Sequence, residues 1–275
     1  TVTGTNVDIT GVNSLAVSGG FGAISFDAGS SVINSSGAAV AITGRVGGSF
    51  SHFGSISSNG TTASGITISG ATGANSVTFG GQVSLGTTTA LTSVGVSVDN
   101  GGTASTVAFD GGLQVVTSTA AALVGTGGGT LRISDAGTET LSTTDAMTLS
   151  LSGMAVDITL DEVNAINANM TSVLLQNLDG SFAVNGGALS TVASGSSFNS
   201  FNVIQNDAGA TRALSLAVDN LTIIHEASGA TSLPSEHGIV VTTSGDDSAV
   251  VAISNSTFQT EDSGVRVIGN NGLIT

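Results

Sequence analysis

A repeat of thirty residues between Gly65 and Val115 constrains the fold of this chain more than any other feature of its sequence. The apolar residues of its first half recur in its second half: Ile66, Ile68, Val77, Phe79, Val83 and Leu85 correspond to Val96, Val98, Val107, Phe109, Leu113 and Val115. Each half contains three short stretches in which apolar and polar residues alternate, separated by Gly, Ser, Thr and Asn. A fixed period of about 20–50 residues is typical of solenoid proteins. Three alternating strands per repeat predict one turn of a parallel β-helix.

Matching apolar residues recur along most of the chain with a shorter and less regular spacing. Leu15 recurs as Val40 and then as Ile66, and the series Val107–Leu131–Val156 behaves in the same way. One coil cannot bury its own apolar edge, so coils must stack on one another. We therefore expect an all-β solenoid of roughly ten coils, each of about 24–30 residues, that covers residues 1–275 as a single domain.

Equivalent side chains of successive coils are expected to stack in the interior. Phe26, Phe79 and Phe109 are expected to form an aromatic stack. The turn residues Asn100, Asn220 and Asn255 are expected to form internal ladders, in which amide side chains satisfy one another.

Two stretches depart from the repeat. Residues 160–168 place their apolar side chains nearer to helical spacing, although we expect a pair of strands there rather than a helical turn. The stretch 229–237 contains the only proline of the chain, Pro234, and is expected to be an exposed loop that leaves the coil.

Composition excludes several classes of partner. The net charge is −15, lysine is absent and the basic residues are four arginines. Binding to nucleic acid or to an anionic membrane surface requires clustered Lys or Arg, so neither is expected. No apolar run is long enough for a transmembrane helix. Cysteine is absent, which excludes disulfides and thiolate metal sites.

Several blocks of the sequence resemble very large exported β-helix repeat proteins of bacteria, including autotransporter-type and other adhesin-like surface proteins. These blocks are 77–81 (Val-Thr-Phe-Gly-Gly), 107–112 (Val-Ala-Phe-Asp-Gly-Gly), 128–133 (Gly-Gly-Thr-Leu-Arg-Ile) and 250–258. The resemblance implies a right-handed parallel β-helix at the cell surface or outside the cell, with a role in adhesion, in a stalk or coat, or in self-assembly. Because the chain begins and ends in strand-like alternation, we expect it to be a fragment of a longer repeat protein.

Acidic residues at turns are the candidate ligands for a metal. Carboxylates and backbone carbonyls supply the hard oxygen ligands that Ca²⁺ prefers. The candidates are Asp99, Asp161, Glu162, Asp246, Asp247, Glu261 and Asp262. Turns also favour Asp for purely structural reasons, so an acidic turn without an ion is the competing interpretation. We expect no other cofactor, and we expect His52, His225 and His237 to be surface or loop residues, because none has metal-ligand spacing with another.

Enzymes that act on acidic polysaccharides also use this fold, so catalysis must be considered. Gly245-Asp246-Asp247 resembles the aspartate pair of pectin-hydrolysing β-helix enzymes. Their Gly-His-Gly motif is absent, and their Arg-x-Lys motif is impossible without lysine. We therefore predict no catalytic residue and a non-enzymatic structural or adhesive module of an exported bacterial protein, which contacts glycans, a cell surface or copies of itself. A polysaccharide-degrading enzyme or a phage tailspike-like depolymerase is the alternative.

Overall fold

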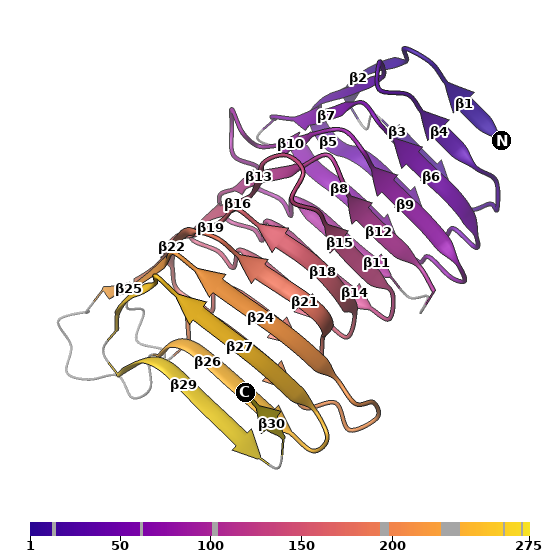
Figure 1. Cartoon of the computed structure of the whole chain (residues 1–275). Coiled ribbons are helices and arrows are strands. Elements are labelled where there is room, and N and C mark those ends of the chain that lie inside the picture. Colours follow the sequence, from indigo (N-terminus) through magenta and orange to yellow (C-terminus); the bar gives the residue numbers. More distant parts are fainter. Residues whose placement is uncertain are drawn as a thin grey trace.

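The computed structural model of the chain describes residues 1–12, 15–60, 63–100, 104–192, 198–226, 237–260, 262–270 and 272–275. Every regular element within these ranges is a β-strand, and all the strand pairings are parallel between successive turns. The strands stack into one elongated solenoid, with the two ends of the chain at opposite ends of the rod (Figure 1). The predicted parallel β-helix is confirmed.

Three strand sets run along the rod, which we call sheets A, B and C. Sheet A has 11 strands: β1 (Val2–Gly4), β4 (Ile24–Phe26), β6 (Gly48–His52), β9 (Asn75–Phe79), β12 (Thr106–Phe109), β15 (Thr130–Ile133), β18 (Ala155–Leu160), β21 (Asp179–Val184), β24 (Ala213–Asp219), β27 (Ser248–Ser254) and β30 (Leu273–Ile274). Figure 1 shows the arrows of these strands side by side along the near face.

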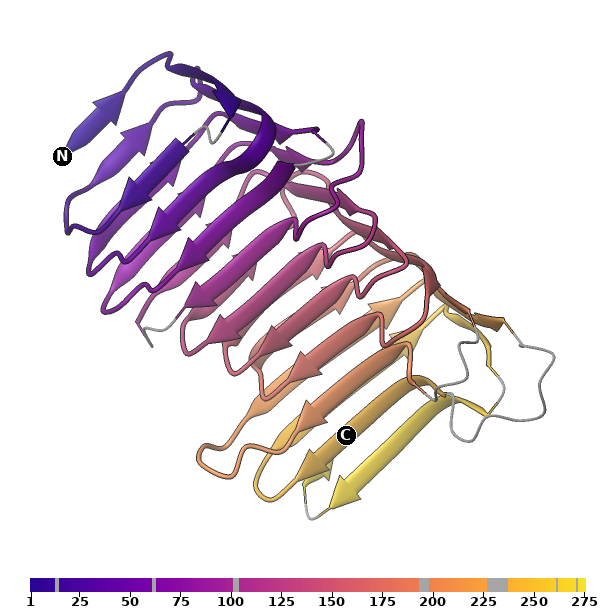
Figure 2. The same cartoon turned by 180° about the vertical axis from the view of Figure 1, so that it is seen from behind.

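Sheets B and C are joined because the long strand β5 (Ser31–Thr43) contributes its first part to sheet B and its last part to sheet C. The other strands of sheet B are β2 (Asp8–Val12), β7 (Ser55–Ser58), β10 (Val83–Leu85), β13 (Leu113–Thr117), β16 (Glu139–Thr144), β19 (Glu162–Ala168), β22 (Gly187–Val192), β25 (Leu221–Glu226) and β28 (Thr257–Gln259). Those of sheet C are β3 (Leu15–Ser18), β8 (Ala63–Ser69), β11 (Val96–Asn100), β14 (Leu123–Gly127), β17 (Leu149–Ser152), β20 (Val173–Gln176), β23 (Phe201–Gln205), β26 (His237–Ser244) and β29 (Ser263–Asn270). Figure 2 shows sheet C from the other side of the rod.

Coil length varies more widely than the sequence predicted. The coil that runs from Val2 to its partner Ile24 is shorter than expected, and the coil that runs from Leu214 to its partner Ala249 is longer. The strands remain in register because only the connections between them absorb the extra residues. The two strands β18 and β19 confirm that residues 160–168 extend rather than coil into a helix. Residues 229–236 of the expected loop lie outside the described ranges, and His237 begins β26.

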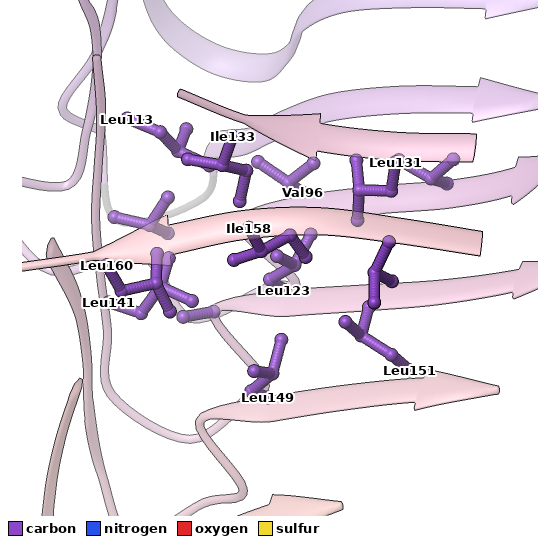
Figure 3. Close-up of a cluster of buried hydrophobic side chains, with 14 of the residues drawn as sticks. Val96, Leu113, Leu123, Leu131, Ile133, Leu141, Leu149, Leu151, Ile158 and Leu160 are labelled. Atoms are coloured by element: carbon purple, nitrogen blue, oxygen red, sulfur yellow. The ribbon is translucent and has the colours of Figure 1, made fainter. Parts of the chain in front are cut away.

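The core is a continuous column of inward-facing side chains from all three sheets. Strands such as β13 and β16 alternate buried and partly exposed residues, as period-two patterning requires. Figure 3 shows a section of this core, in which Leu131 and Ile158 of sheet A, Leu141 of sheet B and Leu149 of sheet C point into the shared interior. Burying each such side chain contributes about 1.5–3 kcal/mol. The core of each coil is thus completed by its neighbours.

The predicted aromatic stack exists, with a histidine inside it. The register aligns Phe26, His52, Phe79 and Phe109 on successive strands of sheet A. Phe79 and Phe109 are stacked, with ring centroids 5.0 Å apart and ring planes 15° apart. His52 occupies the position between Phe26 and Phe79, so the column is a mixed Phe–His stack.

The expected asparagine ladder is wrong. Asn220 and Asn255 are exposed and have φ angles of 51° and 49°, a left-handed turn conformation that Asn tolerates well. Both therefore lie outside the core. Asn100 is buried, but its amide donates to the carbonyl oxygen of Ser105 (3.2 Å) and not to another asparagine. Hydroxyls instead fill one buried corner, where two threonines of neighbouring elements meet, with Thr143 Oγ1 2.9 Å from Thr148 Oγ1.

Both ends of the rod expose side chains of the inward columns. Val265 and Val267 continue the columns of Phe201 and Val203, and they are 40% and 53% exposed in the last described coil. Val2 is 60% exposed at the opposite end. Across the described ranges, no helix is long and apolar enough to cross a membrane.

Candidate binding groove and acidic sites

A groove of about 380 Å³ lies on the outer face of sheet C, over the last coils. Its floor is formed by outward side chains of β23, β26 and β29, and residues Phe198 and Asn199 border it. The register places Asn202, Val240 and Arg266 in one row across three strands. Parallel pairing thus brings together residues from three separate turns of the chain.

Arg266 and His237 form the polar end of this groove. Arg266 Nη1 donates to His237 Nε2 at 2.8 Å. A guanidinium can only donate, so Nε2 must accept and the imidazole proton must reside on Nδ1. Nδ1 then donates to Ser263 Oγ at 2.6 Å, while Asp262 Oδ2 is 3.6 Å away. The imidazole therefore orients the exposed guanidinium through this hydrogen bond.

The other three arginines of the chain bind backbone carbonyls or carboxylates outside this groove. Arg45 is buried and donates to backbone carbonyls, including that of Gly47 at 3.1 Å. Arg132 is paired with Asp110, and Arg212 with Asp179 and Asp207. Arg266 is exposed and has no carboxylate partner among the described residues. In a chain of net charge −15, this groove presents an arginine whose guanidinium is not ion-paired with any carboxylate of the described residues.

The rest of the groove combines an amide acceptor with apolar surface. Asn199 Oδ1 is buried and finds no hydrogen-bond partner in the part of the chain that the structure describes. Phe198, Ile204 and Ile268 supply apolar walls. Because the oxygen of Asn199 is buried, Asn202, in the same row as Arg266, supplies the amide that lines the groove. The groove therefore offers a guanidinium, amide groups and apolar walls to a ligand.

The histidines are buried, contrary to the expectation of surface or loop positions. His52, His225 and His237 are 0%, 4% and 4% exposed. Each occupies a strand position in which the side chain is covered by neighbouring coils. Burial lowers the pKa of His52, although the carbonyl of Gly54 opposes this. Burial also lowers the pKa of His225, and the nearby His237 lowers it further.

Ser200 and His225 form a hydroxyl–imidazole pair, with Oγ 2.6 Å from Nε2. A nucleophilic serine also needs its base within this distance. Ser200, however, is 0% exposed and its backbone carbonyl accepts from Val173, so the pair is enclosed in the corner between sheets B and C. We assign it a structural role in that corner.

The predicted Asp246–Asp247 pair lies in the turn between β26 and β27. Asp246 is exposed, whereas Asp247 is 1% exposed. The Asp247 carboxylate accepts the backbone N–H groups of Asp207 and Arg212, both at 2.7 Å. Asp247 therefore holds the segment 207–212 in place, and its oxygens are engaged with the backbone. The N–H of Gly209 and the side chain of Arg212 lower the pKa of Asp207 in the same segment.

The other predicted calcium ligands are mostly dispersed. Asp99 is an exposed outward residue of β11, and Asp262 is exposed beside His237. Glu162 is exposed and accepts from the side-chain amide of Asn164 at 3.1 Å. Glu261 lies outside the described residues. None of these described residues belongs to a group of three acids within ligand distance of one another.

Asp161 does belong to such a group, together with two residues that the sequence did not single out. Ligand oxygens of Asp135, Glu139 and Asp161 lie within 4.8 Å of one another. Asp135 lies in the connection between β15 and β16, Glu139 begins β16, and Asp161 precedes β19. One signal was available, since Glu139 follows Leu113 at the spacing of one coil and thus occupies an inward position of the repeat.

Comparison of the chain with protein-family models, with curated proteins and with solved structures found no match.

Proposed function

We propose that this chain is a non-enzymatic adhesive and structural module of an exported bacterial surface protein, and that the groove on sheet C binds acidic glycans. The Arg266–His237 pair is the observation that carries the proposal. A guanidinium presents a planar fork of donors that matches a carboxylate, and a fixed fork loses less entropy on binding. His237 fixes it through the 2.8 Å hydrogen bond.

Two further observations support binding over hydrolysis. The residues that line the groove supply a guanidinium, an imidazole, amides and apolar groups, which suit recognition. Glycoside hydrolysis instead uses a pair of carboxyl groups that flank the scissile bond. The aspartate that most resembles such a residue, Asp247, has both carboxylate oxygens bound to backbone N–H groups.

The test is binding to immobilised glycans in two chemical classes, polyuronates and their neutral counterparts, at moderate and high salt. Wild-type protein should bind the acidic class, and high salt should weaken the interaction. Arg266→Gln should bind roughly tenfold or more weakly, because hydrogen bonds to charged groups contribute about 1.5–3 kcal/mol. Arg132→Gln is the matched control, since it removes the same group from an outward position of sheet A. Equal loss in both variants, or no preference for acidic glycans, would refute the assignment of the groove.

The structural half of the proposal is end-to-end assembly of rods. The inward columns are exposed at both ends, where Val267 is 53% and Val2 is 60% exposed. Strands β28, β29 and β30 also end their sheets in the described structure, and an open edge is a template for another strand. Further coils of a longer chain, or a second copy of this one, would continue both the sheets and the apolar core.

Electron microscopy and sedimentation of concentrated protein test this assembly. Wild-type protein should form linear chains of rods, and Val267→Glu should prevent them by placing a charge in the column. Val250→Glu is the control, because Val250 is also 53% exposed but lies on the outer face of sheet A. Monodisperse single rods of wild-type protein at high concentration would count against assembly and would leave the groove proposal intact.

A further inference from the structure

The inward column of sheet B contains a carboxylic acid where its neighbours are aliphatic. Val83 pairs with Leu113, and Leu113 pairs with Glu139. All three side chains are 0% exposed. Glu139 thus occupies a core position in the middle of the rod, at the corner where the chain leaves sheet A and enters sheet B.

The carboxylate of Glu139 is only half satisfied. Oε1 accepts the N–H of Gly137 at 2.9 Å and that of Ala136 at 3.4 Å. Oε2 is buried and has no hydrogen-bond partner among the residues that the structure describes. The chain has no lysine, and no Arg or His of the described ranges is ion-paired with Glu139. A buried acid without a counter-charge is costly, so such groups are normally paired or bound to a metal.

Negative charge is concentrated around this unsatisfied oxygen. Asp161 of the next coil accepts the backbone N–H of Glu139 at 3.1 Å, which brings its carboxylate against that of Glu139. Asp135 reaches the same point from the connection between β15 and β16. Burial raises the pKa of Glu139, and the charge of Asp161 raises it further. Three acids therefore converge where no cationic side chain is paired with them in the described structure.

We propose that Asp135, Glu139 and Asp161 form a divalent-cation site, and that Ca²⁺ is its preferred occupant. Ca²⁺ binds carboxylate oxygens at about 2.3–2.6 Å, so two oxygens on one ion lie at most about 5 Å apart. The oxygens of this group, all within 4.8 Å of one another, meet that limit. Ca²⁺ accepts irregular coordination, whereas Mg²⁺ demands a near-ideal octahedron. The buried Oε2, which lacks a partner among the described residues, distinguishes this group from an ordinary acidic turn.

The site would cross-link two successive coils, because its ligands come from both of them. Asp135 and Glu139 belong to the coil of β15 and β16, and Asp161 belongs to the coil of β18 and β19. An ion between them would replace the missing counter-charge of the core and would fix the corner between sheets A and B. This inference is independent of the glycan-binding groove, which lies in the last coils on sheet C.

Calorimetric titration of chelator-stripped protein with CaCl₂, and separately with MgCl₂, tests the proposal directly. We expect one saturable site that prefers Ca²⁺ and that raises the melting temperature when filled. Asp135→Asn alters an exposed side chain, so it should fold normally and bind Ca²⁺ roughly tenfold or more weakly. Glu162→Gln is the matched control, because it removes a neighbouring exposed acid whose partner is Asn164, and it should bind as the wild type does.

Glu139→Gln provides the second variant. It should abolish Ca²⁺ binding while the ion-free protein unfolds at a higher temperature than ion-free wild type, because the buried charge is gone. Absence of a saturable site in wild type, or equal affinity in Asp135→Asn and Glu162→Gln, would overturn the proposal. In that case the three acids form an acidic corner that holds no ion.

Discussion

The imidazole of His52 packs against the phenyl ring of Phe26, with ring centroids 5.5 Å apart. The pair belongs to the inward column that continues through Phe79 and Phe109. His52 Nδ1 lies 3.2 Å from the carbonyl of Gly54, and its Nε2 is buried without a hydrogen-bond partner in the described ranges. A polar ring therefore occupies an aromatic position of the core, and it must remain neutral there.

His52 should make the rod sensitive to acid. Its pKa is lowered from 6.5 by burial, so the unfolded chain takes up this proton first as the pH falls. The stability that His52 supplies is present above pH 6.5 and is lost as the pH falls toward its folded pKa. His52→Phe should lose less stability than wild type between pH 7.5 and pH 5. Near neutral pH the free energies of unfolding of the two proteins should agree within about 1 kcal/mol, because removing an unsatisfied nitrogen offsets the loss of the Gly54 contact. Urea unfolding at both pH values measures the difference, and identical pH responses would contradict the prediction.

The stacked pair of Phe79 and Phe109 should dominate the stability of the early coils. Both are 0% exposed, so Phe109→Ala should destabilise the protein by about 3–5 kcal/mol through a cavity in a core that cannot collapse. Phe21→Ala makes the same change at a residue that is 72% exposed and should cost less than about 0.5 kcal/mol. Chemical unfolding measures both losses of unfolding free energy. Similar losses in the two variants would contradict the inward position of Phe109.

In protein without Ca²⁺, Glu139 should make stability depend on pH in the direction opposite to that of His52. Its raised pKa means that the folded state holds this proton above pH 4.5, where the unfolded chain releases it. Stability is therefore lost as the pH rises from 4.5 through the folded pKa. In chelator, the free energy of unfolding of wild type should fall by about 1–3 kcal/mol more than that of Glu139→Gln over this rise in pH. This difference is the penalty of a buried charge that lacks hydrogen bonds. The comparison is a series of unfolding curves in EDTA, and a parallel response of the two proteins would show that the carboxyl is solvated.

Asp247 should stabilise the segment 207–212. Asp247→Asn retains one acceptor oxygen and loses the charge, so the N–H groups of Asp207 and Arg212 lose part of their partner. We expect a loss of about 1–3 kcal/mol and faster proteolysis between residues 207 and 212. Asp246→Asn, at the adjacent exposed residue, should change neither quantity. Equal protease resistance of the two variants would argue that the segment is held by other contacts.

Periodicity predicted the architecture because apolar residues repeat wherever strands stack. The pairing of Val77 with Val107 and of Phe79 with Phe109 follows directly from the thirty-residue repeat. The burial of His52 was not predicted because a single histidine carries no period, although it follows Phe26 at the spacing of one coil. Position in the column, and not residue type, determined its burial.

The candidate sites were harder to predict because they depend on register between coils of unequal length. Arg266 and His237 are far apart in the sequence and meet only because β26 and β29 pair as they do. The last coils are long, so the repeat cannot be aligned reliably there without the structure. Glu139 could have been identified from the sequence, because it is an acid aligned with Leu113. The prediction relied instead on adjacent acidic pairs such as Asp161 and Glu162.

Simultaneous measurement of binding and of bond cleavage on one acidic polysaccharide tests the central claim most directly. The protein would be titrated into a polyuronate by calorimetry, and the same mixture would be assayed for new reducing ends and unsaturated products over a day. The prediction is saturable binding that Arg266→Gln weakens roughly tenfold or more, with no product above the level of buffer alone. Product formation by wild-type protein that Arg266→Gln abolishes would contradict it, and would identify the groove as the active site of a polysaccharide-degrading enzyme.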